Sequence, residues 1–169
     1  MSTHSRLLMS CSALFLAFSA GITVTRAAQE QNAATLQGAW RTIEVVLAGS
    51  PSRTLRPGAT LAIFHGRHYS RVEEHVEQPR RPLVDPASAS ADQLRAVWGP
   101  FVGEAGTFEV SGNVITMQAT VAKNPSAMTK GALSVYTYRR DGNILTLTQV
   151  RTHAGPSPTP VTIKMTRVE

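Results

Sequence analysis

The chain has 169 residues, of which 17 are Lys or Arg and 11 are Asp or Glu, giving a formal net charge of +6. This length suits a leader followed by one domain rather than several domains. The basic residues are scattered along the chain and form no stripe, which argues against a nucleic-acid-binding protein. Only one cysteine, Cys11, is present, so a domain held together by disulfides is excluded.

Residues 1–27 have the pattern of a secretory signal peptide. Arg6 provides the positive charge, residues 7–24 are apolar or small, and Thr25-Arg26-Ala27 places small residues where a signal peptidase requires them. The apolar stretch is too short and wrongly flanked for a stable membrane span of about 20 apolar residues. We therefore expect a protein that is exported to the periplasm or secreted after cleavage near Ala27.

A lipid anchor on Cys11 is the rival interpretation of the leader. We favour cleavage near Ala27, because Met9 is large for a lipoprotein motif and the long apolar run follows Cys11 rather than preceding it. Removing the leader leaves no cysteine, and therefore no thiol nucleophile and no thiolate metal site. Without Arg6 and Arg26, 15 basic side chains face 11 acidic ones.

Residues 28–169 are predicted to form one all-β domain. Alternating apolar and polar residues, β-branched side chains and turn dipeptides recur at regular spacing along it. Eight strands in sequential hairpins predict an up-and-down antiparallel barrel. The expected strands are 36–48, 59–65, 67–74, 105–111, 114–122, 132–140, 143–152 and 161–168.

One short helix is expected between the third and fourth strands. Ser90-x-x-Gln93 is a capping box, and an apolar stripe follows it at helical spacing. Gly99-Pro100 should end the helix near Trp98. Periodicity alone allows the stripe to pack on the outer wall or on one open end of the barrel. The stripe consists of Leu94, Val97, Trp98, Phe101 and Val102, and we predict the second arrangement, in which Leu94, Val97 and Trp98 pack onto one open end as a cap.

Several motifs in order resemble the bacterial lipocalin-like domain family, whose members have calycin-type barrels. The motifs are Leu36-x-Gly-x-Trp-Arg41, Gly66-x-x-Tyr69-Ser70, Pro79-Arg80-Arg81-Pro82, Gly106-Thr107-Phe108-Glu109-Val110 and Asp141-Gly142-Asn143-Ile144-Leu145-Thr146-Leu147. The chain departs from the family at Thr116-Met117-Gln118, where a His-rich stretch is usual, and it lacks a Trp after Pro125. The resemblance implies the barrel fold and a binding role.

The same resemblance implies that Trp40 pairs with an Arg on the last strand, at the position of Arg167. Alternation independently places Arg167 on the core-facing side, with Ile163 and Met165. A guanidinium over an indole contributes about 0.5–2 kcal/mol. We therefore interpret Trp40 and Arg167 as part of the architecture.

Candidate ligand-binding residues come from three strands and the helix. Glu44 shares the inward face of Trp40 unless a bulge intervenes, and an interior carboxylate could orient a ligand or act as an acid or base. We favour the alternative, in which strand one is bulged or forms an edge there and Glu44 lies in solvent. Arg71 is the natural partner for an interior carboxylate, and it shares a strand face with Tyr69 and Glu73. Alternation leaves open whether tyrosines of the sixth strand line a pocket or face solvent. The predicted ligand-binding set is Glu44, Tyr69, Arg71, Tyr136, Tyr138 and Trp98.

We expect a non-catalytic protein that binds a small hydrophobic or amphipathic molecule in its barrel. The histidines, His65, His68, His75 and His153, lack zinc-ligand spacing, and no cofactor motif is visible, so neither a metal nor a cofactor is predicted. One alternative is an enzyme of isomerisation or cyclisation with Glu44 or Tyr69 as the proton-transfer group. Another is an exported inhibitor barrel that binds a protein.

Overall fold

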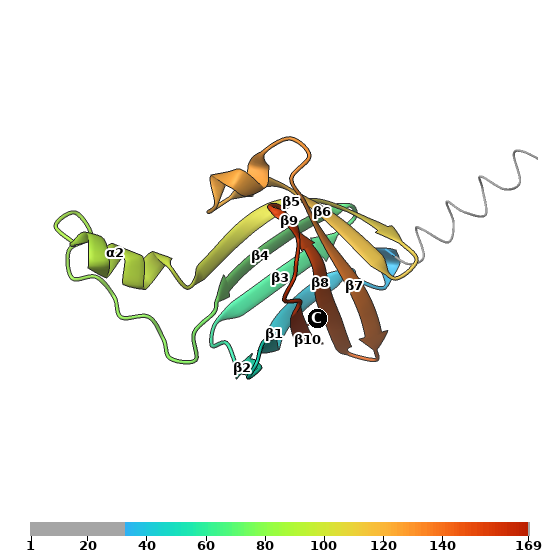
Figure 1. Ribbon diagram of the computed structural model, residues 1–169, viewed down its shortest axis with the longest axis horizontal. Coiled ribbons are helices and arrows are strands. Elements are labelled where there is room, and N and C mark those ends of the chain that lie inside the picture. Colours follow the sequence, from blue (N-terminus) through green and yellow to red (C-terminus); the bar gives the residue numbers. More distant parts are fainter. Residues whose placement is uncertain (1–32, 169) are drawn as a thin grey trace, which may run out of the picture.

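The computed structural model describes residues 33–168, which form a closed antiparallel barrel with one α-helix beside it (Figure 1). The predicted signal peptide and Cys11 lie outside the described residues. The elements in chain order are β1 (Gly38–Leu47), β2 (Arg53–Leu55), β3 (Thr60–His65), β4 (His68–Glu74), α2 (Ala91–Trp98), β5 (Phe101–Ser111), β6 (Val114–Ala122), the 3-10 helix η1 (Pro125–Met128), β7 (Leu133–Asp141), β8 (Ile144–Thr152), β9 (Gly155–Pro156) and β10 (Val161–Arg167).

Eight of these strands close the barrel. The hydrogen-bonded order is β1-β3-β4-β5-β6-β7-β8-β10, and β10 pairs with both β8 and β1, so the sheet has no free edge along its main path. The short strands β2 and β9 are added to β1 and β8. The predicted eight-stranded antiparallel barrel is confirmed. No helix among residues 33–168 is both long and apolar enough to cross a membrane.

The two ends of the barrel differ in their connections. Hairpin turns join β3 to β4, β5 to β6 and β7 to β8 at one end, which we call the narrow end. Each turn contains a glycine with positive φ: 59° at Gly66, 57° at Gly112 and 56° at Gly142. Side chains other than glycine rarely adopt this conformation, so these residues permit the tight turns. The long connections gather at the opposite, wide end, and comprise residues 48–59, 75–100, 123–132 and 153–160.

The narrow end is filled around Trp40. The indole is fully buried, and its Nε1 donates a hydrogen bond to the carbonyl oxygen of Leu36 at 2.8 Å. The Arg167 guanidinium lies 5.5 Å from the Trp40 ring centroid, as the sequence leads one to expect, and that of Arg140 lies 5.7 Å from it. Apolar side chains from most strands pack beneath the indole, so this end forms the core of the fold.

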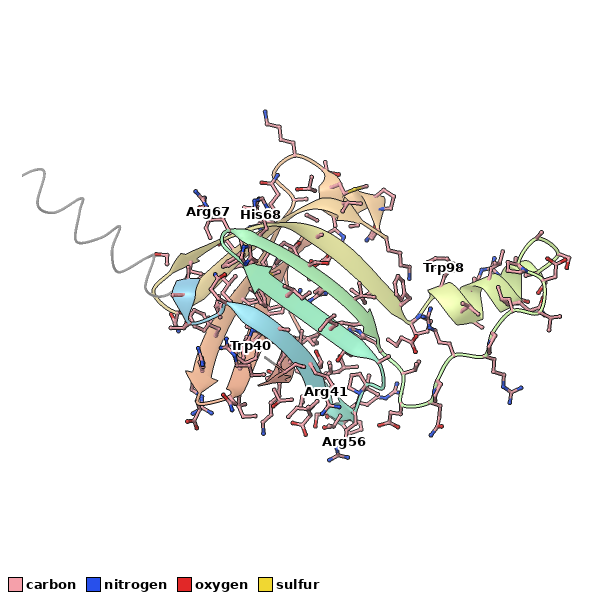
Figure 2. All side chains as sticks on the ribbon, turned by 180° about the vertical axis from the view of Figure 1, so that it is seen from behind. Trp40, Arg41, Arg56, Arg67, His68 and Trp98 are labelled. Carbon is pink, nitrogen blue, oxygen red and sulfur yellow. The ribbon has the colours of Figure 1, made fainter. Side chains whose placement is uncertain are left out.

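The helix α2 does not cap the barrel, so the predicted cap is wrong. Its boundaries agree with the sequence, because Ser90 and Gln93 form the capping box and Trp98 is the last residue. However, none of its residues is buried, and the Trp98 side chain is 52% exposed. Figures 1 and 2 show α2 projecting away from the barrel.

Two cations explain why α2 points outward. The Lys123 ammonium donates hydrogen bonds to the carbonyl oxygens of Trp98, Gly99 and Phe101. Nη1 of Arg80 donates to the carbonyl oxygen of Val97 at 2.9 Å. These bonds satisfy the free carbonyls of the last turn. They also hold the helix end beside β5 and β6, and the chain enters β5 at Phe101 without turning back over the barrel.

Candidate functional site

Ionisable side chains gather inside the barrel toward the wide end. Because side chains alternate along β4, Tyr69, Arg71 and Glu73 all point inward. Glu104 on β5 is the register partner of Arg71, and Tyr136 reaches the same region from β7. We call these five residues the interior cluster. Tyr69, Glu73 and Tyr136 are buried, with exposures of 4%, 1% and 1%.

Arg71 is the centre of the interior cluster. Its Nε lies 3.1 Å from Oε1 of Glu104, and the two side chains keep 15% and 16% exposure. The distance marks an ion pair, but the buried Nε–H has no hydrogen-bond partner. Arg71 also hydrogen-bonds to Tyr136. Since β4 and β7 lie three strands apart in the closed order, this bond crosses the interior.

Burial and neighbouring charges fix the protonation of these groups. Burial raises the pKa of Tyr69, and the Glu104 carboxylate raises it further. Burial likewise raises the pKa of Tyr136. Burial by itself lowers the pKa of Arg71, but the acidic groups around it outweigh this effect, and the net change is upward. At neutral pH the cluster therefore offers two hydroxyl donors and one guanidinium cation.

Glu73 is held as a carboxylate on the wide-end side of Arg71. Oε1 accepts a hydrogen bond from Oγ1 of Thr42 at 3.3 Å, and Oε2 lies 2.7 Å from Nε2 of His75. Burial raises the pKa of Glu73, but attraction to Arg71 and the bonds from His75 and Thr42 lower it more, so the net pKa lies below its ordinary value. Glu73 is thus a fixed anion rather than a proton acceptor.

The remaining predicted tyrosine and one unpredicted amide extend the site. Nε2 of Gln149 on β8 donates to the hydroxyl of Tyr136 at 2.9 Å, which orients that hydroxyl within the interior. Tyr138 is partly buried and packs against the apolar core. Tyr136 therefore belongs to the interior cluster and to the buried core, whereas Tyr138 packs against that core without joining the interior cluster.

Two predicted ligand residues lie on the outside of the barrel. The pairing of β1 with β10 shifts register between Thr42 and Glu44. After this bulge Glu44 faces the exposed side beside Lys164, and Val45 takes the inward position. The favoured alternative for Glu44, a bulge, is therefore what the structure shows. Trp98 lies outside the barrel because α2 does.

Glu104, His75 and Gln149 were not predicted as site residues. Glu104 was missed because Phe101 and Val102 were assigned to the apolar stripe of the helix, so that the fourth strand was expected only from 105. The alternation of β5, in which Gly106, Phe108 and Val110 are buried, extends backward to Glu104 and could have found it. His75 lies one residue beyond β4, where alternation no longer indicates direction.

Comparisons with known proteins add no partner or activity. No protein-family model matches the chain, and no curated protein matches it either. Among the residues that the structure describes, no three His, Cys, Asp or Glu side chains form a group that could hold a metal ion. The interior cluster is therefore interpreted from its own geometry.

Proposed function

We propose that the barrel binds a small amphipathic molecule, without catalysis, through its wide end. The polar group of the ligand lies against the interior cluster, and its apolar part faces the wide end. The observation that carries this proposal is Arg71: an inward-facing guanidinium, partly reached by solvent, whose buried Nε–H lacks a hydrogen-bond partner. A ligand oxygen would supply the missing acceptor.

The surroundings of Arg71 support an amphipathic ligand over a purely polar one. Inward-facing aliphatic side chains line the interior between the interior cluster and the wide end: Val45 is buried, and Val102 and Val161 are partly buried. Ligand sites are commonly apolar with a few placed polar groups. An eight-stranded barrel is wide enough to hold one small ligand. The resemblance to the bacterial lipocalin-like domain family favours the same role.

Binding is favoured over the enzymatic alternative because neither of the two predicted proton-transfer groups, Glu44 and Tyr69, suits that role. Glu44 lies outside the barrel. The raised pKa of Tyr69 makes its phenolate inaccessible near neutral pH, and the lowered pKa of Glu73 makes that carboxylate a weak proton acceptor. We further propose that the leader, residues 1–27, directs export, so that the ligand is met in the periplasm or outside the cell.

The test is to identify a bound compound and to change Arg71. Native mass spectrometry of protein purified from the exported compartment should show a co-purifying mass, and a library of amphipathic compounds should give thermal shifts. Arg71→Lys keeps the charge but loses the planar donor fork, so it should weaken binding at least about tenfold. Arg67→Lys is the matched control, because Arg67 is exposed and outside the barrel. No bound mass together with no thermal shift would remove the proposal.

A further inference from the structure

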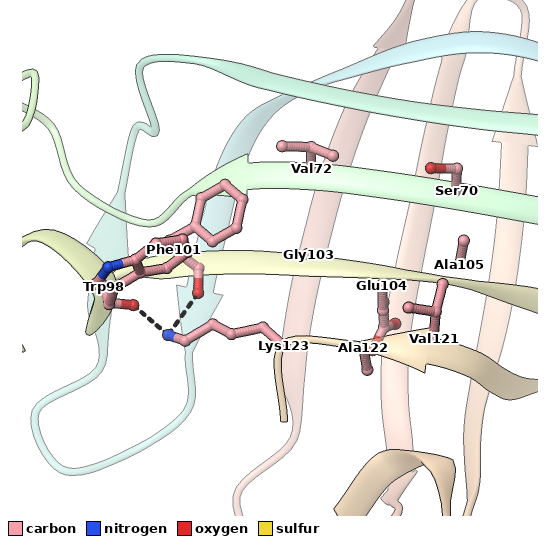
Figure 3. Close-up of a pocket in the computed structure, with 10 residues that line it drawn as sticks. All are labelled: Ser70, Val72, Trp98, Phe101, Gly103, Glu104, Ala105, Val121, Ala122 and Lys123. Atoms are coloured by element: carbon pink, nitrogen blue, oxygen red, sulfur yellow. Dashed lines mark hydrogen bonds between the residues drawn. The ribbon is translucent and has the colours of Figure 1, made fainter. Parts of the chain in front are cut away.

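The outer wall of the barrel carries an apolar groove at the base of α2 (Figure 3). The outward-facing side chains of β4, β5 and β6 line it on one side, and Trp98 closes one end, in edge-to-face contact with Phe101 at 5.7 Å between centroids. Its volume is about 610 Å³, and its lining includes Val72, Trp98, Phe101, Ala105, Val121 and Lys123.

Exposed apolar side chains on β3, β4 and β6 extend from this groove along the outer wall. Val72 is 49% exposed, Val121 61% and Trp98 52%. On β3, Leu61 and Ile63 continue the surface, because Leu61 is the register partner of Val72 and Ile63 that of Ser70. Contiguous exposed apolar surface of this kind marks an interaction site. We call these five apolar residues, with the groove, the outer apolar face.

The helix α2 carries a second apolar surface, which its own chain covers only in part, and the end of the helix is held in place. Leu94 and Val97 are only partly buried, and no residue of α2 is buried. Besides binding the helix end, Arg80 forms an ion pair with Glu74 at 2.5 Å and lies 4.9 Å from the Phe101 ring centroid. Lys123 bonds the helix end from β6. Trp98 thus lies against the outer apolar face of its own chain, whereas the part of α2 that precedes it extends away from that face (Figure 1).

We propose that a second copy of this chain covers both surfaces. In a two-fold dimer, α2 of each copy lies on the outer apolar face of the other, so that one contact, made twice, buries both helices and both faces. This interaction goes beyond the proposed ligand binding and does not depend on it.

The available apolar area is most of what such a contact needs. Taking about 200 Å² for a tryptophan and about 90 Å² for an aliphatic side chain, the exposed fractions of the outer apolar face amount to about 300 Å². A standard interface buries about 800 Å² per partner, of which about 450 Å² is apolar. Leu94 and Val97 are partly buried and add less than half of the remainder, so the contact is smaller than a standard interface and a weak dimer is expected.

Length and charge also agree with this arrangement. The eight residues of α2 span about 12 Å, and the strand from His68 to Val72 spans about 13 Å. A helix placed along the face with its end in the partner's groove would therefore bring its first turn near the narrow end. Asp92 in that turn is 91% exposed and pairs with Arg95, and Arg67, which lies at that end of the face, pairs with Glu109, so the contact brings no unpaired like charges together (Figure 2).

A membrane surface is a less suitable partner than a second copy for the connection 75–100, which contains α2. The connection 75–100 contains three acidic residues, Glu77, Asp85 and Asp92, and three arginines, Arg80, Arg81 and Arg95. It therefore lacks the excess of positive charge that favours anionic lipid.

The first experiment is sedimentation velocity of the purified protein over a range of concentrations. We expect a monomer–dimer equilibrium that Trp98→Asp and Val121→Asp each weaken at least about tenfold. Val150→Asp is the matched control, because Val150 is an exposed valine of β8, on the other side of the barrel. A protein that stays monomeric up to about 100 μM, or a dimer that Trp98→Asp leaves unchanged, would overturn the proposal.

The second experiment tests which surfaces meet. In a Cys11→Ser background, one preparation carries Leu94→Cys and another carries Val72→Cys. Mixing the two under oxidising conditions should give a covalent heterodimer in excess of either homodimer. Placing both changes in one chain gives a control: an internal disulfide in the monomer would show the helix folding onto its own wall and would overturn the proposal. Binding of the monomer to lipid vesicles that Trp98→Asp abolishes would assign the face to a membrane instead.

Discussion

The narrow and wide ends of the barrel are built from the same strands but differ in their inward side chains. At the narrow end β1 contributes Trp40 in an apolar environment. One inward position farther along, the same strand contributes Thr42, which bonds to the Glu73 carboxylate. Along β4 the sequence changes from Tyr69 to Arg71 to Glu73 toward the wide end. The barrel thus has its apolar core toward the narrow end and its charged interior side chains toward the wide end.

Two ion pairs of the same chemistry, each an Arg with a Glu, show how an exposed and an interior environment differ. Arg67 pairs with Glu109 outside the barrel, where the two side chains are 73% and 63% exposed. Arg71 pairs with Glu104 inside it, at 15% and 16% exposure. Water screens the first pair, so it contributes little to stability. The second pair lies among buried groups, and the loss of one partner leaves an uncompensated charge.

The largest expected effect lies at the narrow end. Trp40→Ala should lower the free energy of unfolding by about 3–5 kcal/mol, because it leaves a cavity in the packed core. The control is Trp98→Ala, which should cost much less in monomeric protein, because about half of that side chain is already in solvent. Urea unfolding at low protein concentration measures both. Equal losses would contradict the separation of a structural from a peripheral tryptophan.

Arg71→Met tests the wide end. Removing the guanidinium leaves Glu73 and Glu104 without their cation, and we expect a loss of about 3 kcal/mol, the low end for a buried ion pair, because Arg71 keeps some exposure. Arg67→Met should cost less than about 1 kcal/mol. Parallel urea titrations give the difference. Two similar values would mean that solvent screens the interior pair as it screens the outer one.

The pH dependence of the unfolding free energy should show the titration of the Glu73 carboxyl group. Its pKa is lowered in the folded protein, so the stabilisation it provides is present above the ordinary pKa of about 4.5 and is lost as the pH falls below that value. Glu73→Gln removes this titration and should flatten the acid limb of the stability curve. Unfolding free energies measured from pH 3 to pH 6 test it. The account fails at this point if wild type and variant show the same slope.

The smallest effect concerns the cations around Trp40. Arg140→Met should cost about 1 kcal/mol through the loss of its contact with the indole and of its hydrogen bonds to the carbonyl oxygens of Thr35 and Gly142. Methionine keeps much of the apolar stem, so packing changes little. Chemical denaturation of the variant beside wild type gives the value. A loss as large as that of Trp40→Ala would show that Arg140, rather than packing, holds this end together.

The sequence predicts the barrel well because strand alternation depends on local residues. All eight barrel strands were found, and Tyr69, Arg71 and Tyr136 were placed in the predicted ligand-binding set. The position of Glu44 could not be fixed, because a one-residue bulge reverses the faces and depends on the pairing with β10.

The helix shows a different limit. Its ends and its apolar stripe follow from Ser90, Gln93 and the Gly99-Pro100 pair, and they are correct. The sequence does not identify the surface against which the stripe packs, because an apolar stripe indicates only that its burial is favourable. The outward direction is set by Lys123 and Arg80, which come from distant parts of the chain.

The central claim is that a ligand supplies an acceptor to Arg71 inside the wide end. The most direct measurement is the Nε–Hε resonance of each arginine by NMR, recorded while the compound that binds in the library screen is added. The Arg71 resonance should move downfield as its unpartnered Nε–H gains a hydrogen bond, while that of Arg67 stays in place. A bound compound that leaves the Arg71 resonance unchanged would contradict the account.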